Sequence, residues 1–172
     1  MLFSSMTFLF VFMPLVMAVY FLSKKEIRNY VLLIASIIFY AWGEPRYLAI
    51  MIITILVNYA GAILLDKHYS SRQRLWIVSL TVVLDLSFLF YFKYFNFVVD
   101  NINGVLVTDF QLLDVIMPIG ISFYTFQAMS YLIDVYRREV PAQKDVYKLA
   151  LYIVLFPQLV AGPIVKYHDV CE

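Results

Sequence analysis

The sequence alternates long apolar blocks with short polar connections. Six apolar segments occupy residues 2–22, 29–42, 47–65, 75–94, 112–136 and 148–166. About 20 residues of helix cross the hydrocarbon core of a bilayer, and ~17 is near the lower limit. The first, third, fourth and fifth segments reach this length; 29–42 is short, but its Tyr40 and Trp42 are typical of a membrane interface. The pattern therefore predicts an all-α, polytopic transmembrane bundle with about six membrane segments.

The cations divide the connections into rich and poor ones. The first, third and fifth segments are followed by three, three and four Lys or Arg residues, whereas the second is followed by one and the fourth ends with one. Cation-rich connections lie in the cytoplasm, so 24–28, 67–74 and 137–148 are expected there and the N-terminus outside. The cation-free connection 96–111 is also expected outside. Residues 2–22 lack the preceding positive charge of a signal peptide and predict a retained helix.

Proline and glycine interrupt the last two segments. Pro118 and Gly120 fall within the fifth, and Pro157, Gly162 and Pro163 fall within the sixth. Backbone groups freed by such breaks are tolerated only against protein or a wet cavity. We therefore predict helices that bend or re-enter the membrane around a central site. Two ordinary proline kinks are the alternative.

A polar stripe follows the break in the fifth segment. Gln127, Ser130, Tyr131 and Asp134 are spaced i, i+3, i+4 and i+7, which places them on one helix face. Such a face points into the bundle, where it either joins helices by hydrogen bonds or lines a passage for substrate or acyl group. The candidates for lining this passage are Ser122, Tyr124, Gln127, Tyr131, Asp134 and Gln158.

Asp85 lies in the middle of the fourth segment, between Leu84 and Leu86. An ionised carboxylate at that depth costs at least about 2.5–3.5 kcal/mol, so this one must be paired, protonated or functional. Lys93 shares its side of the helix but lies about 12 Å further along the axis. That separation is too large for direct pairing, and we expect the lysine to extend towards the interface instead.

Composition excludes several classes of protein. Hydrophobic residues make up 63% of the chain and charged residues 15%, whereas soluble domains carry about 25% charged residues. The net charge of +1 gives no basis for nucleic-acid binding. Cys171 is the single cysteine, and His68 and His168 have no further ligand at metal-binding spacing, so no metal site and no bound cofactor are expected. Local motifs identify no catalytic residue.

Three stretches are distinctive: MLFSSMTFLF at 1–10, YFKYFNF at 91–97, and MPIGISFYTFQAMSYLIDVYR at 117–137, which is followed by FPQLVAGPI at 156–164. Together they resemble the membrane-bound O-acyltransferase family, specifically its bacterial alginate O-acetylase branch. The resemblance implies a bacterial inner-membrane enzyme that transfers an acyl group, such as acetyl, to a hydroxyl of an exported polysaccharide such as alginate. It also implies a cytoplasmic acyl donor (acetyl-CoA or similar), a polar tunnel, and a partner acyltransferase outside the membrane.

The chain departs from this family in its length. Family members are more than twice as long, and their central histidine is expected beyond residue 172, so its role passes to neither His68 nor His168. We therefore expect residues 1–172 to form the N-terminal part of a longer transmembrane domain, inactive alone. The alternatives are a non-enzymatic membrane component of a polysaccharide export or modification complex, or a transporter. The absence of an inverted repeat counts against the transporter.

The charge pattern predicts a topology that reporter fusions can measure. Fusions at Lys25, Gln73 and Lys144 should all report the cytoplasm, because each lies in a cation-rich connection. A periplasmic signal at Gln73 would show that one of the segments 29–42 and 47–65 does not cross the membrane completely.

Overall fold

The computed structural model describes residues 5–67, 70–106, 111–112, 117–161, 165 and 167. The described part is all-helical, without a strand, as the apolar pattern predicts. Two π-turns, η1 (Phe8–Phe12) and η3 (Phe90–Tyr94), and the 3-10 turn η2 (Pro45–Tyr47) adjoin its helices. The α-helices are α1 (Met13–Leu22), α2 (Arg28–Gly43), α3 (Leu48–Lys67), α4 (Ser71–Leu89), α5 (Phe95–Leu106), α6 (Ile121–Arg137), α7 (Val146–Val154) and α8 (Phe156–Ala161).

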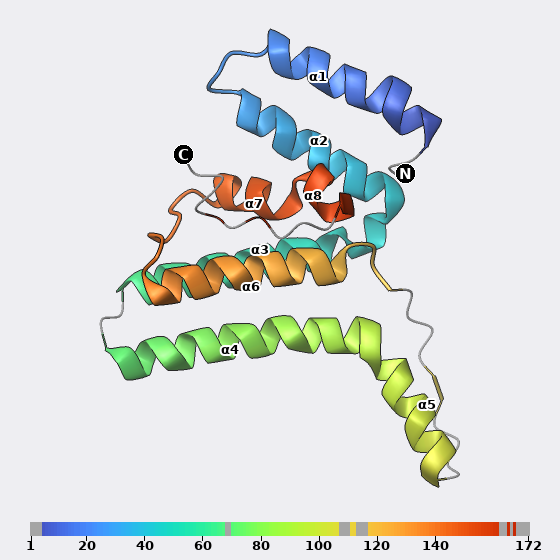
Figure 1. Cartoon of the computed structure of the whole chain (residues 1–172), viewed down its shortest axis with the longest axis vertical. Coiled ribbons are helices and arrows are strands. Elements are labelled where there is room, and N and C mark those ends of the chain that lie inside the picture. Colours follow the sequence, from blue (N-terminus) through green and yellow to red (C-terminus); the bar gives the residue numbers. More distant parts are fainter. Residues whose placement is uncertain are drawn as a thin grey trace.

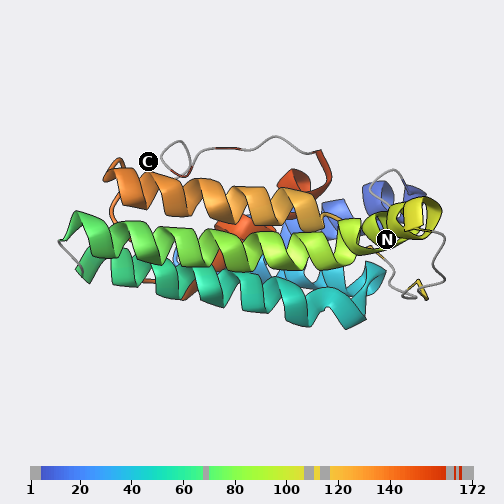
Figure 2. The same ribbon diagram turned by 90° about the horizontal axis from the view of Figure 1, so that it is seen from below.

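Three long helices form the centre of the bundle. Helices α3 and α6 run side by side, and α4 packs against both of them (Figures 1 and 2). The short helices α7 and α8 lie between this layer and α2, and α1 covers the far side of α2 (Figure 1). Helix α5 turns away from the bundle at the end of α4. The arrangement buries α6 on several sides and makes it the central helix.

The buried side chains form two clusters. The larger one lies between α3, α4, α6 and α7 and includes the fully buried Tyr124, Tyr131 and Leu132 of α6. The smaller one joins η1, α2 and α8, where the ring of Phe8 lies 5.3 Å from that of Phe39 and 5.9 Å from that of Phe156. Large apolar side chains elsewhere, such as Trp76 of α4 (72% exposed), face outward, which suits contact with lipid.

Two stretches of the described chain are long and apolar enough to cross a membrane. They are Pro45–Lys67 with 23 residues and Ser71–Val105 with 35. Phe8–Leu22 and Val146–Leu159 are shorter apolar helices. Six complete membrane segments therefore remain a prediction, while the helical membrane character of the chain is supported.

The break in the fifth segment lies before α6 rather than within it. The segment 112–136 predicted a helix, but α6 begins at Ile121, directly after Gly120. Gly120 has a φ of 75°, a left-handed conformation that glycine adopts without strain from a Cβ atom. The preceding residue, Ile119, donates its N–H to Glu44 Oε2 at 3.1 Å. A proline kink inside α6 is therefore the wrong interpretation: Pro118 and Gly120 set where this helix starts.

The sixth segment is broken, as its sequence predicts. Helix α7 ends at Val154, Leu155 is not helical, and α8 starts at Phe156. Pro157 falls in the first turn of α8, where a missing N–H removes no bond from the helix ladder. Gly162 and Pro163 lie outside the described residues.

One polar connection is partly helical. Residues 96–111 were expected only as a connection outside the cell, yet their first part belongs to helix α5, which follows η3. Its apolar residues Phe95, Val98, Val99 and Ile102 recur at helical spacing between the asparagines, so the segment is an amphipathic helix.

Gly61 allows the three central helices to approach closely. A Cβ atom added there would lie 2.8 Å from Thr81 Oγ1 on α4 and 3.2 Å from Leu132 Cδ1 on α6. Overpacking of this kind costs typically about 1–3 kcal/mol. We therefore predict that Gly61→Ala lowers the free energy of unfolding by this amount, measured by SDS-induced unfolding in mixed micelles.

Gly104 provides the matched control, because nothing lies within 4 Å of its added Cβ atom. Gly104→Ala should leave stability unchanged or raise it by roughly 0.5–1 kcal/mol, the helical advantage of alanine. Adding Thr81→Ala to Gly61→Ala should restore part of the loss. Equal stability of Gly61→Ala and the unmodified protein would contradict close packing at this point.

Candidate functional site

The polar stripe of α6 faces the interior, as its spacing predicts. Gln127, Tyr131 and Asp134 are buried, with exposed fractions of 3%, 0% and 7%, and Ser130 is half-buried. The stripe faces α7 and α8, because Gln127 bonds to Tyr152 and Gln158 and the ring of Tyr131 lies 6.5 Å from that of Tyr152. Its polar groups are therefore placed against protein and not against lipid, which is the arrangement that buried polar groups require.

Gln127 compensates for the break between α7 and α8. Because Leu155 leaves the helix, the carbonyl of Tyr152 loses a partner in the ladder; Gln127 Nε2 donates to it at 2.7 Å. The same nitrogen also lies 2.7 Å from Gln158 Oε1 of α8. On the other side of the break, the N–H of Phe156 is donated to Ser36 Oγ of α2 at 3.3 Å. Two side chains thus satisfy two of the backbone groups that the break exposes.

Three tyrosines lie beside this network. The ring of Tyr167 is 4.8 Å from that of Tyr131 and 5.0 Å from that of Tyr152. The Tyr131 hydroxyl accepts the backbone N–H of Gln143 at 2.8 Å, and Gln143 Nε2 donates to the Tyr167 hydroxyl at 2.7 Å. The Tyr152 hydroxyl donates to the carbonyl of Val165 at 2.7 Å. These bonds join the connection after α6 to α6 itself and to Tyr167, and they join α7 to Val165.

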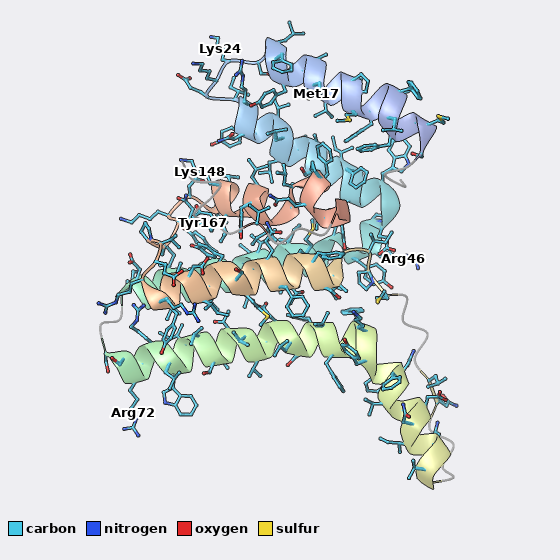
Figure 3. The ribbon with its side chains drawn as sticks, viewed as in Figure 1. Met17, Lys24, Arg46, Arg72, Lys148 and Tyr167 are labelled. Atoms are coloured by element: carbon cyan, nitrogen blue, oxygen red, sulfur yellow. The ribbon has the colours of Figure 1, made fainter. Side chains whose placement is uncertain are left out.

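A cavity of about 670 Å³ opens next to the tyrosines. Its lining combines apolar side chains with polar groups of both charges, from Asn29, Leu32, Glu139, Val140, Pro141, Ala142, Gln143, Lys148, Leu151, Tyr152, Leu155, Gln158 and Tyr167. Figure 3 shows Lys148 and Tyr167 near the beginning of α7, at the end of the bundle that also carries Lys24 and Arg72. Volumes of about 300–1,000 Å³ are typical of small-molecule sites.

The structure brings only some of the six candidates together. Gln158 lines the cavity; Gln127 bonds to it, and Tyr131 contacts the lining ring of Tyr167. Tyr124 is buried elsewhere, with its ring 6.5 Å from that of Tyr40. The remaining two lie near opposite ends of α6, Ser122 in its first turn and Asp134 in its last. The stripe is therefore as long as the helix rather than a compact site.

Lys93 reaches the first turn of α6. Its Nζ donates to Ser122 Oγ at 3.2 Å, on an exposed part of the surface. Sequence analysis expected Lys93 to extend towards the interface and did not identify Ser122 as its partner.

Asp85 is paired, and sequence analysis did not identify its partner. Asn58 Nδ2 of α3 donates to both carboxyl oxygens, at 3.0 and 2.9 Å, and both residues are fully buried. The positions of the two residues could have indicated the pair, because Asn58 and Asp85 are polar residues in the middle of successive apolar segments. Such residues are expected to find each other across neighbouring helices.

Arg74 was predicted as a loop cation but is buried, at 7% exposed. Its guanidinium donates to the carbonyls of Leu65 at 2.6 Å, Val135 at 3.1 Å and Tyr136 at 2.6 Å. These carbonyls lie in the last turns of α3 and α6, where the i+4 ladder ends and the dipole favours a cation. The carbonyl of Val135 also accepts the N–H of Arg138 at 3.1 Å. Arg74 of α4 therefore joins the ends of three helices.

The described residues contain no group of three or more His, Cys, Asp or Glu side chains arranged to hold a metal ion. His68 and His168 lie outside the described part of the chain.

The apolar helices, the outward-facing hydrophobic surface and the buried polar network define an all-helical membrane protein. The chain is 42% identical over its whole length to the probable alginate O-acetylase AlgI of Pseudomonas syringae pv. tomato and 40% identical to that of Azotobacter vinelandii. It is 29% identical over 98% of its length to the peptidoglycan O-acetyltransferase of Helicobacter pylori. Over its whole length the chain is thus similar to proteins named as alginate O-acetylases, which confirms the resemblance in its motifs.

The chain spans about a third of the length of these relatives: the matches cover 34%, 36% and 38% of them respectively. No family model and no solved structure matches the sequence.

The Asn58–Asp85 pair predicts a sharp difference between single and double substitutions. Asn58→Leu leaves a buried carboxyl without its donor, which should lower the free energy of unfolding by about 1–3 kcal/mol. Replacing both residues by leucine should be nearly neutral, because neither unpaired polar group remains. SDS-induced unfolding of the three proteins measures this. If Asn58→Leu is as stable as the double variant, the pair does not stabilise the contact between α3 and α4.

Proposed function

We propose that this chain is part of a membrane O-acyltransferase that transfers an acetyl group to hydroxyls of an exported polysaccharide, with alginate as the model acceptor. The observation that carries the proposal is the roughly 40% identity, over the whole chain, to proteins named as alginate O-acetylases. The more distant peptidoglycan O-acetyltransferase supports the same reaction on a different polysaccharide. Both relatives imply an ester formed on a sugar hydroxyl.

The placement of the cations supports a topology for the proposed enzyme. Lys24, Arg72 and Lys148 lie at one end of the bundle, and Arg46 lies towards the opposite end (Figure 3). The cation-rich end is assigned to the cytoplasm, so the N-terminus is outside the cell and the protein resides in the bacterial inner membrane. This topology requires the first five predicted segments to cross the membrane.

The cavity is the proposed entrance for the acyl donor. It opens at the cation-rich end, where a cytoplasmic donor such as acetyl-CoA would approach, and Lys148 in its lining offers a positive charge to an anionic donor. Gln158 leads from the cavity to Gln127, and the rest of the α6 stripe continues along the bundle. Gln127, Tyr131 and Gln158 would then line the part of the passage next to the cavity.

Residues of this chain are proposed to position the substrates, and none is assigned a catalytic role. Acyl transfer requires a base that takes the proton from the attacking hydroxyl, and the family histidine expected for this role lies beyond residue 172. The proposal also includes a polysaccharide acceptor and a partner acyltransferase outside the membrane, which would complete the transfer.

Gln127→Leu in the full-length enzyme tests whether the stripe lines the passage. Leucine keeps the bulk but removes the donor to Tyr152 and Gln158, so stability should fall by about 1–3 kcal/mol through the unpaired carbonyl. A passage-lining role additionally lowers acetyl transfer per folded molecule. Transfer should be measured as polysaccharide acetylation at matched levels of folded protein.

Ser36→Ala is the matched control. It removes the partner on the other side of the same helix break, at a residue that does not line the cavity. It should cost stability without lowering transfer per folded molecule. Asp134→Asn tests the far end of the stripe, since it keeps the shape and removes the charge. Normal acetylation by both Gln127→Leu and Asp134→Asn would refute the passage and leave the stripe as a joint between helices.

A further inference from the structure

Helix α5 follows α4 without an interruption in the chain but does not join the bundle. The π-turn η3 connects the two helices, and α5 then turns across the direction in which α3, α4 and α6 run (Figures 1 and 2). Among the described helices its main contact is with η3.

The lengths place the start of α5 at the membrane boundary. Helix α4 has 19 residues, or about 28 Å of helix, which matches the roughly 30 Å of a hydrocarbon core. The whole stretch Ser71–Val105 has 35 residues, about 52 Å if straight, which is far longer than the core. Because Arg72 and Arg74 mark the cytoplasmic end of α4, α5 begins at the opposite boundary.

The junction has the composition of a membrane interface. The sequence of η3 is FYFKY, and Phe90, Tyr91 and Tyr94 are all between 43% and 48% exposed. Aromatic rings of this kind gather at the level of the lipid headgroups. The Lys93 cation lies 5.6 Å from the ring centre of Tyr94, so the charge also remains at this level.

The residues of α5 divide into two faces. The apolar face follows i, i+3, i+4, i+7 and i+10 spacing and consists of Phe95, Val98, Val99, Ile102 and Val105. The other side carries Asn96, Asp100, Asn101, Asn103 and Gly104, with Phe97 as an apolar exception. Towards the end of the helix the apolar face is open, because Ile102 is 37% exposed and Val105 is 80% exposed.

We propose that α5 lies in the plane of the outer membrane–water interface, with its apolar face in the acyl chains and its polar side among the headgroups. The surface that faces lipid along α4, which includes the exposed Leu80 and Val83, continues through η3 onto this face. Lipid therefore covers it without a further partner. Free interfacial helices are often rich in Lys and Arg; α5 has neither, and its covalent link to α4 supplies the attachment instead.

Spin labels at two adjacent positions test the proposal. Val105→Cys and Gly104→Cys are both exposed in the structure, and nothing lies within 4 Å of a Cβ atom added at Gly104. The two positions differ in that residue 105 lies on the apolar face of α5 and residue 104 on its polar side. The labels are introduced into the full-length protein with Cys171→Ser and any other cysteine replaced, in vesicles of phosphatidylethanolamine and phosphatidylglycerol. Leu80→Cys on α4 verifies that the protein has inserted.

The measured quantity is the collision rate of each spin label with oxygen, which concentrates in lipid, and with a water-soluble nickel chelate. The label at residue 105 should favour oxygen several-fold over nickel, as at residue 80, and the label at 104 should show the reverse. Equal access of nickel to both positions would overturn the proposal, because α5 would then lie in water. Protection of residue 105 from both reagents would also overturn it, since a protein surface would then cover the apolar face.

Discussion

Inside an apolar bundle, a backbone group that leaves its helix ladder must find another polar partner, and this constraint organises the centre of the molecule. The break between α7 and α8 exposes the carbonyl of Tyr152 and the N–H of Phe156. Gln127 of α6 and Ser36 of α2 satisfy them. The break thereby fixes α7 and α8 against helices on both of their sides. It also explains why a polar residue occupies the most buried stretch of α6.

The need of buried polar groups for partners also accounts for Arg74 and for the pair of Asn58 and Asp85. Arg74 satisfies carbonyls at the ends of α3 and α6, and Asn58 supplies hydrogen bonds to the carboxyl of Asp85. Each contact joins different helices, and such contacts are directional, unlike apolar packing in lipid. The polar groups thus determine which helices are neighbours. Small residues such as Gly61 determine how closely they approach.

Apolar block length, helical spacing and proline position predicted much of the fold, because these signals are local. They predicted the helical class, the interior position of Gln127, Tyr131 and Asp134, and the break at Phe156–Pro157. They did not predict that Pro118 and Gly120 precede α6, because a glycine with positive φ serves equally well inside a bend or before a helix. Helix α5 was missed because its polar residues indicated a connection, although its apolar residues already had helical spacing.

The candidate site was less predictable, because its contacts join residues distant in sequence. Helical spacing identified Gln127 as a residue that faces the interior. Its partner could not be identified, because Gln127 bonds to the backbone carbonyl of Tyr152, and every residue type has such a carbonyl. The cavity depends on the connection 139–143 folding against α2 and α7, and periodicity says nothing about such a connection. The sequence alone does not distinguish Arg74 from an exposed arginine in a loop. The difference appears only in the fold, where the ends of α3 and α6 lie next to the beginning of α4.

The bonds of Arg74 also order the assembly of the bundle during synthesis. Its bond to Leu65 spans 9 residues, so it can form as soon as α3 and α4 are inserted as a hairpin. Its bond to Tyr136 spans 62 residues and must wait until α6 has left the ribosome. During that interval the guanidinium keeps part of its hydration at the membrane surface. When α6 arrives, its carbonyl groups replace this water. The hairpin of α3 and α4 therefore offers α6 a binding site that exists before α6 is made.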